Sequence, residues 1–326
     1  RKGSICKRSF GECLDADFSL VYNKYTTISV AISVVRIFHR EGENNTMQNK
    51  ISQMQIGNQT FQVADSTYIM GILNVTPDSF SDGGKYNNTD AALKQVERMA
   101  AEGAAIIDVG GESTRPGHEK ISEEEEIQRT AEIIGLIKER FDIPVSIDTY
   151  KGKVAKAALQ AGADMVNDIW GLKYDETLAQ VIADFGVSCC LMHNRDNTEY
   201  HNFMEDVKAD LKETVTIARN AGIAEDKIIL DPGVGFGKTY EHNLEVIGKL
   251  GELRELGFPL LLGTSRKSVI GITLDLPVTE RLEGTLVTTV MGMLAGCAFV
   301  RVHDVLANKR AIQMAEAIMR YNPREN

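Results

Sequence analysis

Short apolar runs alternate with amphipathic segments from residue 68 almost to the end of the chain. Polar residues rarely interrupt these runs, which is typical of strands buried on both faces of a sheet. The runs predict strands at residues 68–73, 104–109, 144–147, 165–166, 187–192, 228–230, 259–262 and 298–300. Apolar positions at helical spacing predict helices at residues 90–102, 122–140, 151–161, 176–185, 204–221, 243–256, 279–296 and 304–321. Ser122 and Thr279 are the predicted N-caps of two of these helices, and Glu125 is expected to complete a capping box with Ser122.

Eight strand–helix units in roughly 260 residues match the repeat number and size of a (β/α)8, or TIM, barrel. A doubly wound open sheet is the alternative, but its glycine-rich loop would directly follow the first strand. The residues from Asn74 to Pro77 stand there instead and bear no likeness to that loop. We therefore predict an α/β fold of the TIM-barrel class. Residues 54–63 alternate around Gly57 and Asn58, which predicts a short N-terminal hairpin that closes one end of the barrel.

Polar side chains follow most of the predicted strands. In TIM barrels the active site lies at the C-terminal ends of the strands. A single polar residue at a strand end often only caps a helix or satisfies the backbone. Polar residues at so many strand ends are difficult to explain in that way. Carboxylates and amides suit the edges of a flat nitrogen heterocycle, and cations after the last strand suit a phosphate. We therefore predict a ligand that joins a heterocycle to phosphate, bound by Asn74, Arg115, Asp148, Asn167, Asp231, Lys267, Arg301 and His303.

Two loops have unusual compositions. The first strand ends at Asn74 and is followed by turn-forming residues up to Gly84, with Asp78, Asp82 and the aromatic Phe80 among them, which suits a site that closes over a ligand. The segment DPGVGFGKT, residues 231–239, is not a P-loop, because Pro232 occupies the place of the first glycine. We interpret it as a flexible backbone floor beneath a flat ring; a set of tight left-handed turns is the simpler alternative.

Charge and composition narrow the function further. The net charge of −10 argues against nucleic acid as a partner, and no apolar run approaches the ~18 residues of a membrane span. The five cysteines form no CxxC pair, which favours buried thiols in a reducing cytoplasm. The histidines lack zinc-ligand spacing, whereas Mg²⁺ between Asn74, loop carboxylates and phosphate oxygens is chemically reasonable. We expect residues 1–46 to be a leader or a segment added for expression, and residues 47–326 to form one catalytic domain.

Six motifs occur in this order: GILNVTPDSFSDGG, DVGGESTRPG, SIDTYK, VNDIWG, DPGVGFGK and GTSRKSVIG. Together they resemble the dihydropteroate synthases over about residues 54–321. The resemblance implies a stand-alone bacterial transferase of folate biosynthesis. Such an enzyme condenses 6-hydroxymethyl-7,8-dihydropterin pyrophosphate with para-aminobenzoate, which sulfonamides mimic, to give 7,8-dihydropteroate and pyrophosphate.

The resemblance also implies a role for individual residues. It assigns the pterin to Asp148, Asn167, Ile169, Met192, Asp231, Phe236 and Lys267. It assigns pyrophosphate to Asn74, Thr114, Arg115, Arg301 and His303, with Mg²⁺ on Asn74, and para-aminobenzoate to Phe80, Pro116 and Ser268. The implied catalytic residues are Asp82, Arg115 and Lys267, in an SN1-like path in which pyrophosphate leaves first and Asp82 stabilises the cation. A homodimer through the last two long helices is implied as well.

Two other functions use the same fold. A pterin-dependent methyltransferase shares the pterin acceptors, but its substrate has no diphosphate to require Arg115, Arg301 and His303. A Schiff-base aldolase would use Lys267 as its nucleophile.

Overall fold

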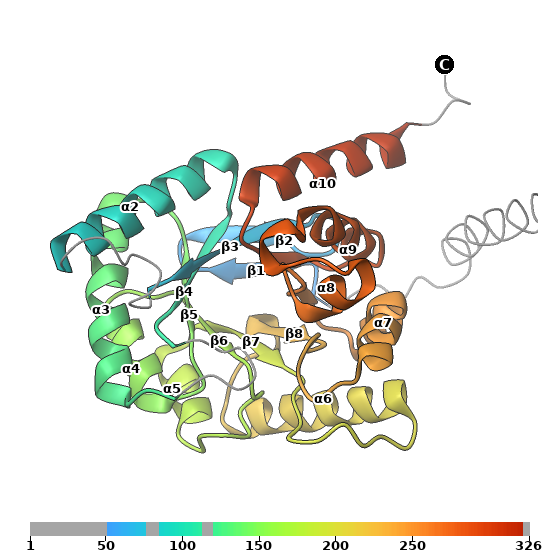
Figure 1. The fold of residues 1–326 in the computed structure, drawn as a ribbon. Coiled ribbons are helices and arrows are strands. Elements are labelled where there is room, and N and C mark those ends of the chain that lie inside the picture. Colours follow the sequence, from blue (N-terminus) through green and yellow to red (C-terminus); the bar gives the residue numbers. More distant parts are fainter. Residues whose placement is uncertain (1–50, 76–84, 113–119, 322–326) are drawn as a thin grey trace, which may run out of the picture. The chain divides into compact units, whose positions relative to one another are not determined.

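The computed structural model describes residues 51–75, 85–112 and 120–321, and the side chains of residues 85–88 are not included. Eight parallel strands form one sheet, in the order β8-β7-β6-β5-β4-β3-β10-β9 (Figure 1). The Leu230 N–H donates to the Pro259 carbonyl at 2.9 Å, so the two outer strands also meet and close the barrel. The strands are β3 (Tyr68–Asn74), β4 (Ile106–Gly110), β5 (Val145–Asp148), β6 (Met165–Asp168), β7 (Ser188–Met192), β8 (Ile228–Asp231), β9 (Leu261–Leu262) and β10 (Phe299–Val302). The predicted TIM barrel is confirmed.

Helices surround the barrel (Figure 1). They are α2 (Lys85–Glu102), α3 (Glu123–Arg140), α4 (Gly152–Gln160), α5 (Leu178–Phe185), α6 (Phe203–Asn220), α7 (Tyr240–Gly248), α8 (Ser268–Leu274), α9 (Leu282–Leu294) and α10 (Val305–Arg320). Among the described residues, no helix is both long and apolar enough to cross a membrane.

Three helix predictions need correction. The helix expected over residues 243–256 ends at Gly248 and is followed by a 3-10 segment, Leu250–Leu256, because the glycines in this stretch weaken an α-helix. Thr279 does not cap α9; it lies in a 3-10 turn, and Arg281 precedes the helix, with its guanidinium bound to the Leu276 carbonyl at 3.1 Å. Ser122 does cap α3, but the Glu125 carboxylate pairs with Arg129 and leaves half of the predicted box unformed.

The predicted hairpin is present and closes the N-terminal end of the barrel. Strands β1 (Gln53–Ile56) and β2 (Gln59–Gln62) pair antiparallel across a two-residue turn. Phe61 packs edge-to-face on Tyr68, with ring centroids 4.9 Å apart, at the start of β3. The Ser188 hydroxyl, at the start of β7, donates to the Gln55 carbonyl at 2.9 Å. The hairpin therefore covers the end of the barrel opposite the C-terminal ends of the strands.

Candidate active site

Residues from four neighbouring strands stand in one row at the C-terminal end of the barrel, and three of them carry polar side chains. The strand register pairs Asn74 with Gly110, Gly110 with Asp148, and Asp148 with Asn167. Gly110 leaves a gap in this row: a Cβ there would lie 3.5 Å from Asn74 Oδ1 and 3.7 Å from Asp148 Oδ2. Parallel pairing thus brings together three polar residues that the sequence predicted separately.

Arg301, on β10, reaches across this end of the barrel to two carboxylates. Its Nε donates to Asp108 Oδ2 and its Nη2 to Asp148 Oδ2, both at 2.6 Å. Asn167 Nδ2 also donates to Asp108 Oδ2, at 3.1 Å. The guanidinium predicted for pyrophosphate therefore lies against an acceptor predicted for the pterin.

Asp108 was missed by the sequence analysis, although it is a lone carboxylate inside the apolar run 104–109. It is fully buried, as is nearly all of Asp148. Burial raises the pKa of Asp148 to about 7; Arg301 opposes this shift and the nearby Asp108 adds to it. Within the described chain, the Oδ1 atoms of Asp108 and Asp148 have no hydrogen-bond partner. Buried acceptors of this kind are costly unless a donor meets them, and the N–H groups of a heterocycle would supply one.

Asp231 and Lys267 form the other side of the site. Asp231 Oδ1 accepts from the Gly233 N–H at 2.7 Å, and Lys267 Nζ donates to the Val234 carbonyl at 2.5 Å. The Lys267 ammonium also lies 4.8 Å from the centre of the Phe236 ring. Burial raises the pKa of Asp231 and lowers that of Lys267 to about 8, and each charge opposes the shift of the other.

The loop from Asp231 to Lys238 follows the tight-turn interpretation. Gly233, Gly235 and Gly237 have φ values of 71°, 87° and 53°, in the left-handed region that favours glycine. Side chains hold this backbone in place: the Gly235 N–H donates to Asn243 Oδ1 at 2.6 Å, and Tyr200 Oη donates to the Gly237 carbonyl at 2.6 Å. We expected a flexible backbone in residues 231–239, but hydrogen bonds from side chains hold this loop in a fixed conformation.

Three of the remaining described residues of the predicted site lie at strand ends, and Ser268 lies farther along the chain from β9. His303 follows β10, and its Nδ1 is 3.0 Å from the Ser265 hydroxyl. Ser268 begins the short helix α8, as expected. Ile169 directly follows β6, and Met192 is the last residue of β7. Five predicted residues lie outside the described part of the chain: Phe80, Asp82, Thr114, Arg115 and Pro116.

A buried ionic cluster that the sequence did not predict lies next to residues 113–119, which are outside the described part of the chain. Glu112 accepts from Lys151 Nζ at 2.7 Å, from Tyr150 Oη at 2.7 Å and from the Ile121 N–H at 3.0 Å. Lys151 also donates to Glu126 at 2.8 Å. Because Glu112 precedes residues 113–119 and Ile121 follows them, this cluster joins the two ends of that segment.

The described residues offer few ligands to a metal ion. No group of three or more His, Cys, Asp or Glu side chains among them could hold one. Asn74 has a partly exposed amide at the C-terminal end of β3, the kind of oxygen donor that Mg²⁺ accepts when phosphate and water supply the other ligands. This fits a metal that binds together with its substrate.

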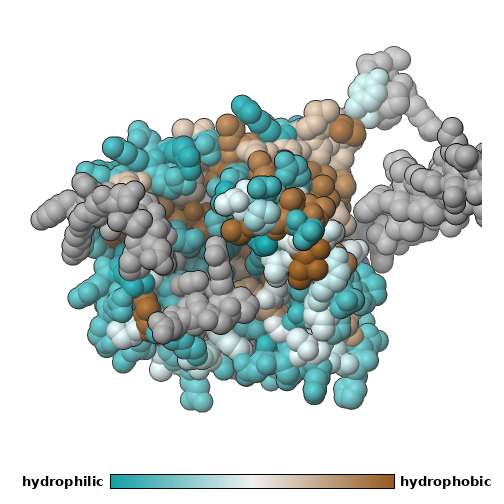
Figure 2. Space-filling model, viewed as in Figure 1, coloured by the Kyte–Doolittle hydropathy of each residue, from teal (hydrophilic) through white to brown (hydrophobic). Residues whose placement is uncertain are grey.

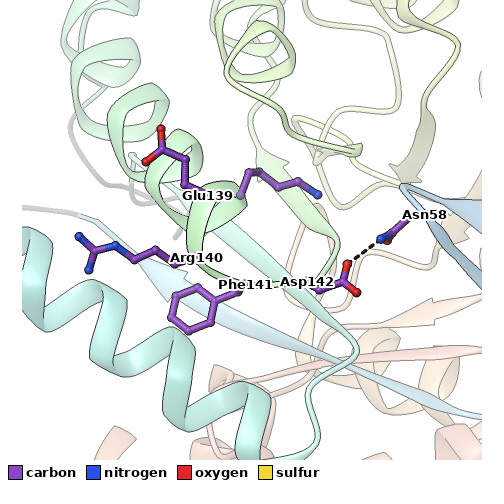
Figure 3. Close-up of a pocket in the computed structure, with 6 residues that line it drawn as sticks. Asn58, Glu139, Arg140, Phe141 and Asp142 are labelled. Carbon is purple, nitrogen blue, oxygen red and sulfur yellow. Dashed lines mark hydrogen bonds between the residues drawn. The ribbon is translucent and has the colours of Figure 1, made fainter.

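A separate shallow pocket is lined by Asn58 and by residues at and just after the end of α3, where Asn58 Nδ2 donates to Asp142 Oδ1 at 2.6 Å (Figure 3). Its wall includes Lys138, Glu139, Arg140 and Phe141, and no residue of the predicted site. This pocket is therefore distinct from the candidate active site.

Comparison with known proteins shows which sequences and structures this chain resembles. The model of the pterin binding enzyme family matches residues 70–303. The dihydropteroate synthase of Clostridium beijerinckii is 62% identical over 268 residues, which cover 82% of this chain and 100% of the relative. A dihydropteroate synthase crystal structure from Clostridium difficile, in the presence of pteroic acid, has a TM-score of 0.78 at 52% identity, covering 80% of this chain and 100% of that one. The Yersinia pestis dihydropteroate synthase with a sulfonamide drug has a TM-score of 0.76 at 38% identity, covering 82% and 98%.

Proposed function

The chain belongs to the dihydropteroate synthase family of pterin-binding enzymes, and from this premise we propose how its residues carry out the reaction. The family reaction joins 6-hydroxymethyl-7,8-dihydropterin, supplied as its pyrophosphate, to the amine of para-aminobenzoate. The bond from the exocyclic carbon to the pyrophosphate oxygen breaks, a carbon–nitrogen bond forms, and the amine loses a proton.

The pterin lies against Asp148, Asn167, Asp231 and Lys267 in our proposal. The observation that carries it is the pair of unpartnered, buried carboxylate oxygens on Asp108 and Asp148, because a pterin edge presents N–H donors to such acceptors. Lys267 supplies the opposite polarity, as a donor. In this proposal, the side chains of Phe236, Ile169 and Met192 contact the two flat faces of the pterin. The Phe236 ring also contacts Lys267.

Pyrophosphate occupies the other half of the site, near Arg301, His303 and Asn74, together with Thr114 and Arg115. Arg301 supports this assignment, because its guanidinium already lies at this end of the barrel, bound to Asp108 and Asp148. Mg²⁺, when bound, would neutralise charge on the pyrophosphate oxygens, and Asn74 would hold it. Phe80, Pro116 and Ser268 are assigned to para-aminobenzoate, which is also where a sulfonamide would compete.

We assign an SN1-like order of events, in which the carbon–oxygen bond breaks before the amine attacks. Asp82 would stabilise the exocyclic cation, and Arg115 the departing pyrophosphate. A pyrophosphate-release assay with both substrates and Mg²⁺ tests the overall reaction. Methyl transfer from a methylated pterin, without pyrophosphate release, would support the methyltransferase instead. Borohydride trapping of a carbonyl substrate on Lys267 would support the aldolase.

A homodimer through α9 and α10 is supported by the orientation of α9. The side of α9 that faces the barrel carries Thr285, Thr289 and Gly292, and Thr289 donates to Asn308 in α10 at 2.7 Å. Leu286, Val290 and Met293 are only partly buried. Val287 and Leu294 on α9 are 59% and 42% exposed, and Met314 and Ile318 on α10 are 62% and 63% exposed. Hydrophobic residues gather over α8, α9 and α10 in Figure 2, which is a surface that a second copy would cover.

Two broader assignments complete the proposal. Cys189, Cys190 and Cys297 are buried free thiols among the described residues, which favours the cytoplasm. Residues 47–326 would form the catalytic domain, with residues 1–46 outside it.

A further inference from the structure

The ammonium of Lys238, at the end of the loop that starts with Asp231, makes three hydrogen bonds. Nζ donates to the Gly233 carbonyl at 3.0 Å and to the Phe236 carbonyl at 3.1 Å, and it is 2.8 Å from His193 Nδ1. In its ammonium form Lys238 has three donors, and each of them has an acceptor here. The lysine therefore turns back beneath its own loop. Burial lowers the pKa of Lys238 to about 7, and the charge of Asp231 opposes this shift.

His193 is held in turn by Asp210. The His193 side chain is fully buried, and its Nε2 lies 3.0 Å from Asp210 Oδ2, which also accepts from Arg195 Nε at 2.6 Å. A carboxylate can only accept, so Nε2 carries the proton and Nδ1 is free to accept from Lys238. Burial lowers the pKa of His193 to about 4, consistent with a neutral ring. The result is one directed chain from Asp210 through His193 to Lys238.

Lys238 binds both ends of the turn of residues 233–236, which borders the candidate site beside Asp231 and Lys267. The Phe236 N–H donates to the Gly233 carbonyl at 3.1 Å, which closes the turn, and Lys238 binds the carbonyls at its two ends. Between them lies Val234, whose carbonyl accepts from Lys267. The Phe236 ring also faces Lys267. A shift of this turn would therefore move two contacts of Lys267.

The turn and His193 are also packed backbone against backbone. A Cβ on Gly233 would lie 1.8 Å from the His193 carbonyl oxygen and 3.3 Å from Lys238 Nζ. Because Gly233 donates to Asp231, this packing extends to the carboxylate assigned to the pterin.

We propose that Lys238 is a positioning residue for pterin recognition, which holds the turn of residues 233–236 against His193 and so places Asp231, Phe236 and Lys267. It touches no substrate itself. The inference rests on the proposed function, because it supposes that these three residues receive the pterin. It follows that loss of the ammonium weakens binding of the pterin substrate and leaves para-aminobenzoate binding largely intact.

The test is Lys238→Met, which keeps the length of the side chain and removes its three donors. We expect the KM for the pterin pyrophosphate, and the Kd measured by pterin fluorescence, to rise about tenfold or more, which is ~1.4 kcal/mol. The KM for para-aminobenzoate at saturating pterin should change less than about threefold. The matched control is Lys208→Met, which removes an ammonium bound to Glu205 at 3.1 Å and Glu255 at 2.8 Å, outside the predicted site. This control should lower the melting temperature without changing the pterin KM.

A second pair of variants decides the matter should Lys238→Met fail to fold. His193→Asn keeps an acceptor oxygen close to the position of Nδ1, whereas His193→Leu removes it. We expect pterin affinity close to that of the wild type in His193→Asn and a loss of about tenfold in His193→Leu.

Three results would overturn the inference. Pterin affinity could be unchanged in Lys238→Met, it could fall equally in Lys208→Met, or it could be the same in the two His193 variants. In each case the wild-type enzyme would still bind pterin and release pyrophosphate, so the proposed function would stand. A wild-type enzyme that binds no pterin would contradict the proposed function, and the inference with it.

Discussion

Arg301 Nη2 and Asp148 Oδ2 lie 2.6 Å apart, where the two halves of the proposed site meet. Asp108 shares the same guanidinium, so two buried carboxylates depend on one cation. A pyrophosphate group would compete for that cation. The proposed pterin and pyrophosphate subsites would therefore be coupled through the side chain of Arg301.

Arg301→Gln should destabilise the free enzyme as well as inactivate it. Breaking a buried ion pair costs ~3–5 kcal/mol, and the 18% exposure of the Arg301 side chain places the effect at the lower end. Urea unfolding measures the change. The double variant Arg301→Gln/Asp148→Asn should recover part of the loss, because one of the stranded charges is gone. Equal stability of wild type and Arg301→Gln would show that the pair contributes nothing net.

The stability contributed by Asp148 should depend on pH. Its folded-state pKa of about 7 lies above the ordinary value, so the folded protein binds the proton more tightly than the unfolded chain does. The contribution is fully present below the unfolded pKa, near 4, and is lost as the pH rises through about 7. The free energy of unfolding, measured from pH 4 to pH 8, should fall with rising pH more steeply in the wild type than in Asp148→Asn. Parallel curves would contradict the raised pKa.

Asp231→Asn should weaken pterin binding selectively. The amide oxygen can still accept from the Gly233 N–H, but the amide NH₂ would replace Oδ2 beside the Lys267 ammonium and the pterin donors. Two donors facing each other in a buried site cost ~1–3 kcal/mol, so pterin affinity should fall about tenfold or more. The melting temperature should barely change. Calorimetric titration with the pterin substrate makes the comparison, and unchanged affinity would reduce Asp231 to a turn residue.

Asp82→Asn tests the assigned mechanism. If Asp82 stabilises the cation, its effect belongs to the transition state. We expect kcat and kcat/KM to fall together by about 10²-fold, with the KM for the pterin substrate nearly unchanged. Recovery of the rate at high Mg²⁺ would instead assign Asp82 to metal binding. Slow pyrophosphate release without para-aminobenzoate is the matching expectation for the wild type, and its complete absence would contradict the SN1-like order.

Quaternary structure can be tested on the exposed apolar surface of α9 and α10. Light scattering at micromolar concentration should give about twice the chain mass of 35.9 kDa. Val287→Glu combined with Ile318→Glu should shift the protein to the monomer, because two buried charges would face an apolar partner. Phe185→Glu, which changes a 40% exposed residue at the end of α5, serves as the control and should leave the dimer intact. A wild type of single-chain mass would exclude the dimer.

The sequence by itself determined the barrel and which residues lie at its C-terminal end, where we propose the site. Strands buried on both faces leave an apolar run without alternation, and turn residues after each run mark its end. Residues such as Asn74, Asp148 and Asp231 could therefore be assigned to one end of the barrel before any contact was known. The hairpin of residues 54–63 was predictable for the same reason, since its pattern is local.

Only the tertiary structure decided which of these side chains meet. Arg301 is 193 residues from Asp108, and the two meet because the closed sheet places β10, β3, β4 and β5 in sequence around the barrel. The sequence also did not show which side of α9 faces the barrel, because this helix is apolar on most sides. Thr285 and Thr289 face inward because they form hydrogen bonds with residues of other elements. From the sequence, Lys238 is only a cation in a glycine-rich loop. Its hydrogen bond to His193, and that of His193 to Asp210, could be known only from the tertiary structure. A local pattern specifies how a segment folds, whereas the charge and hydrogen-bond partners of a buried group come from residues distant in the chain.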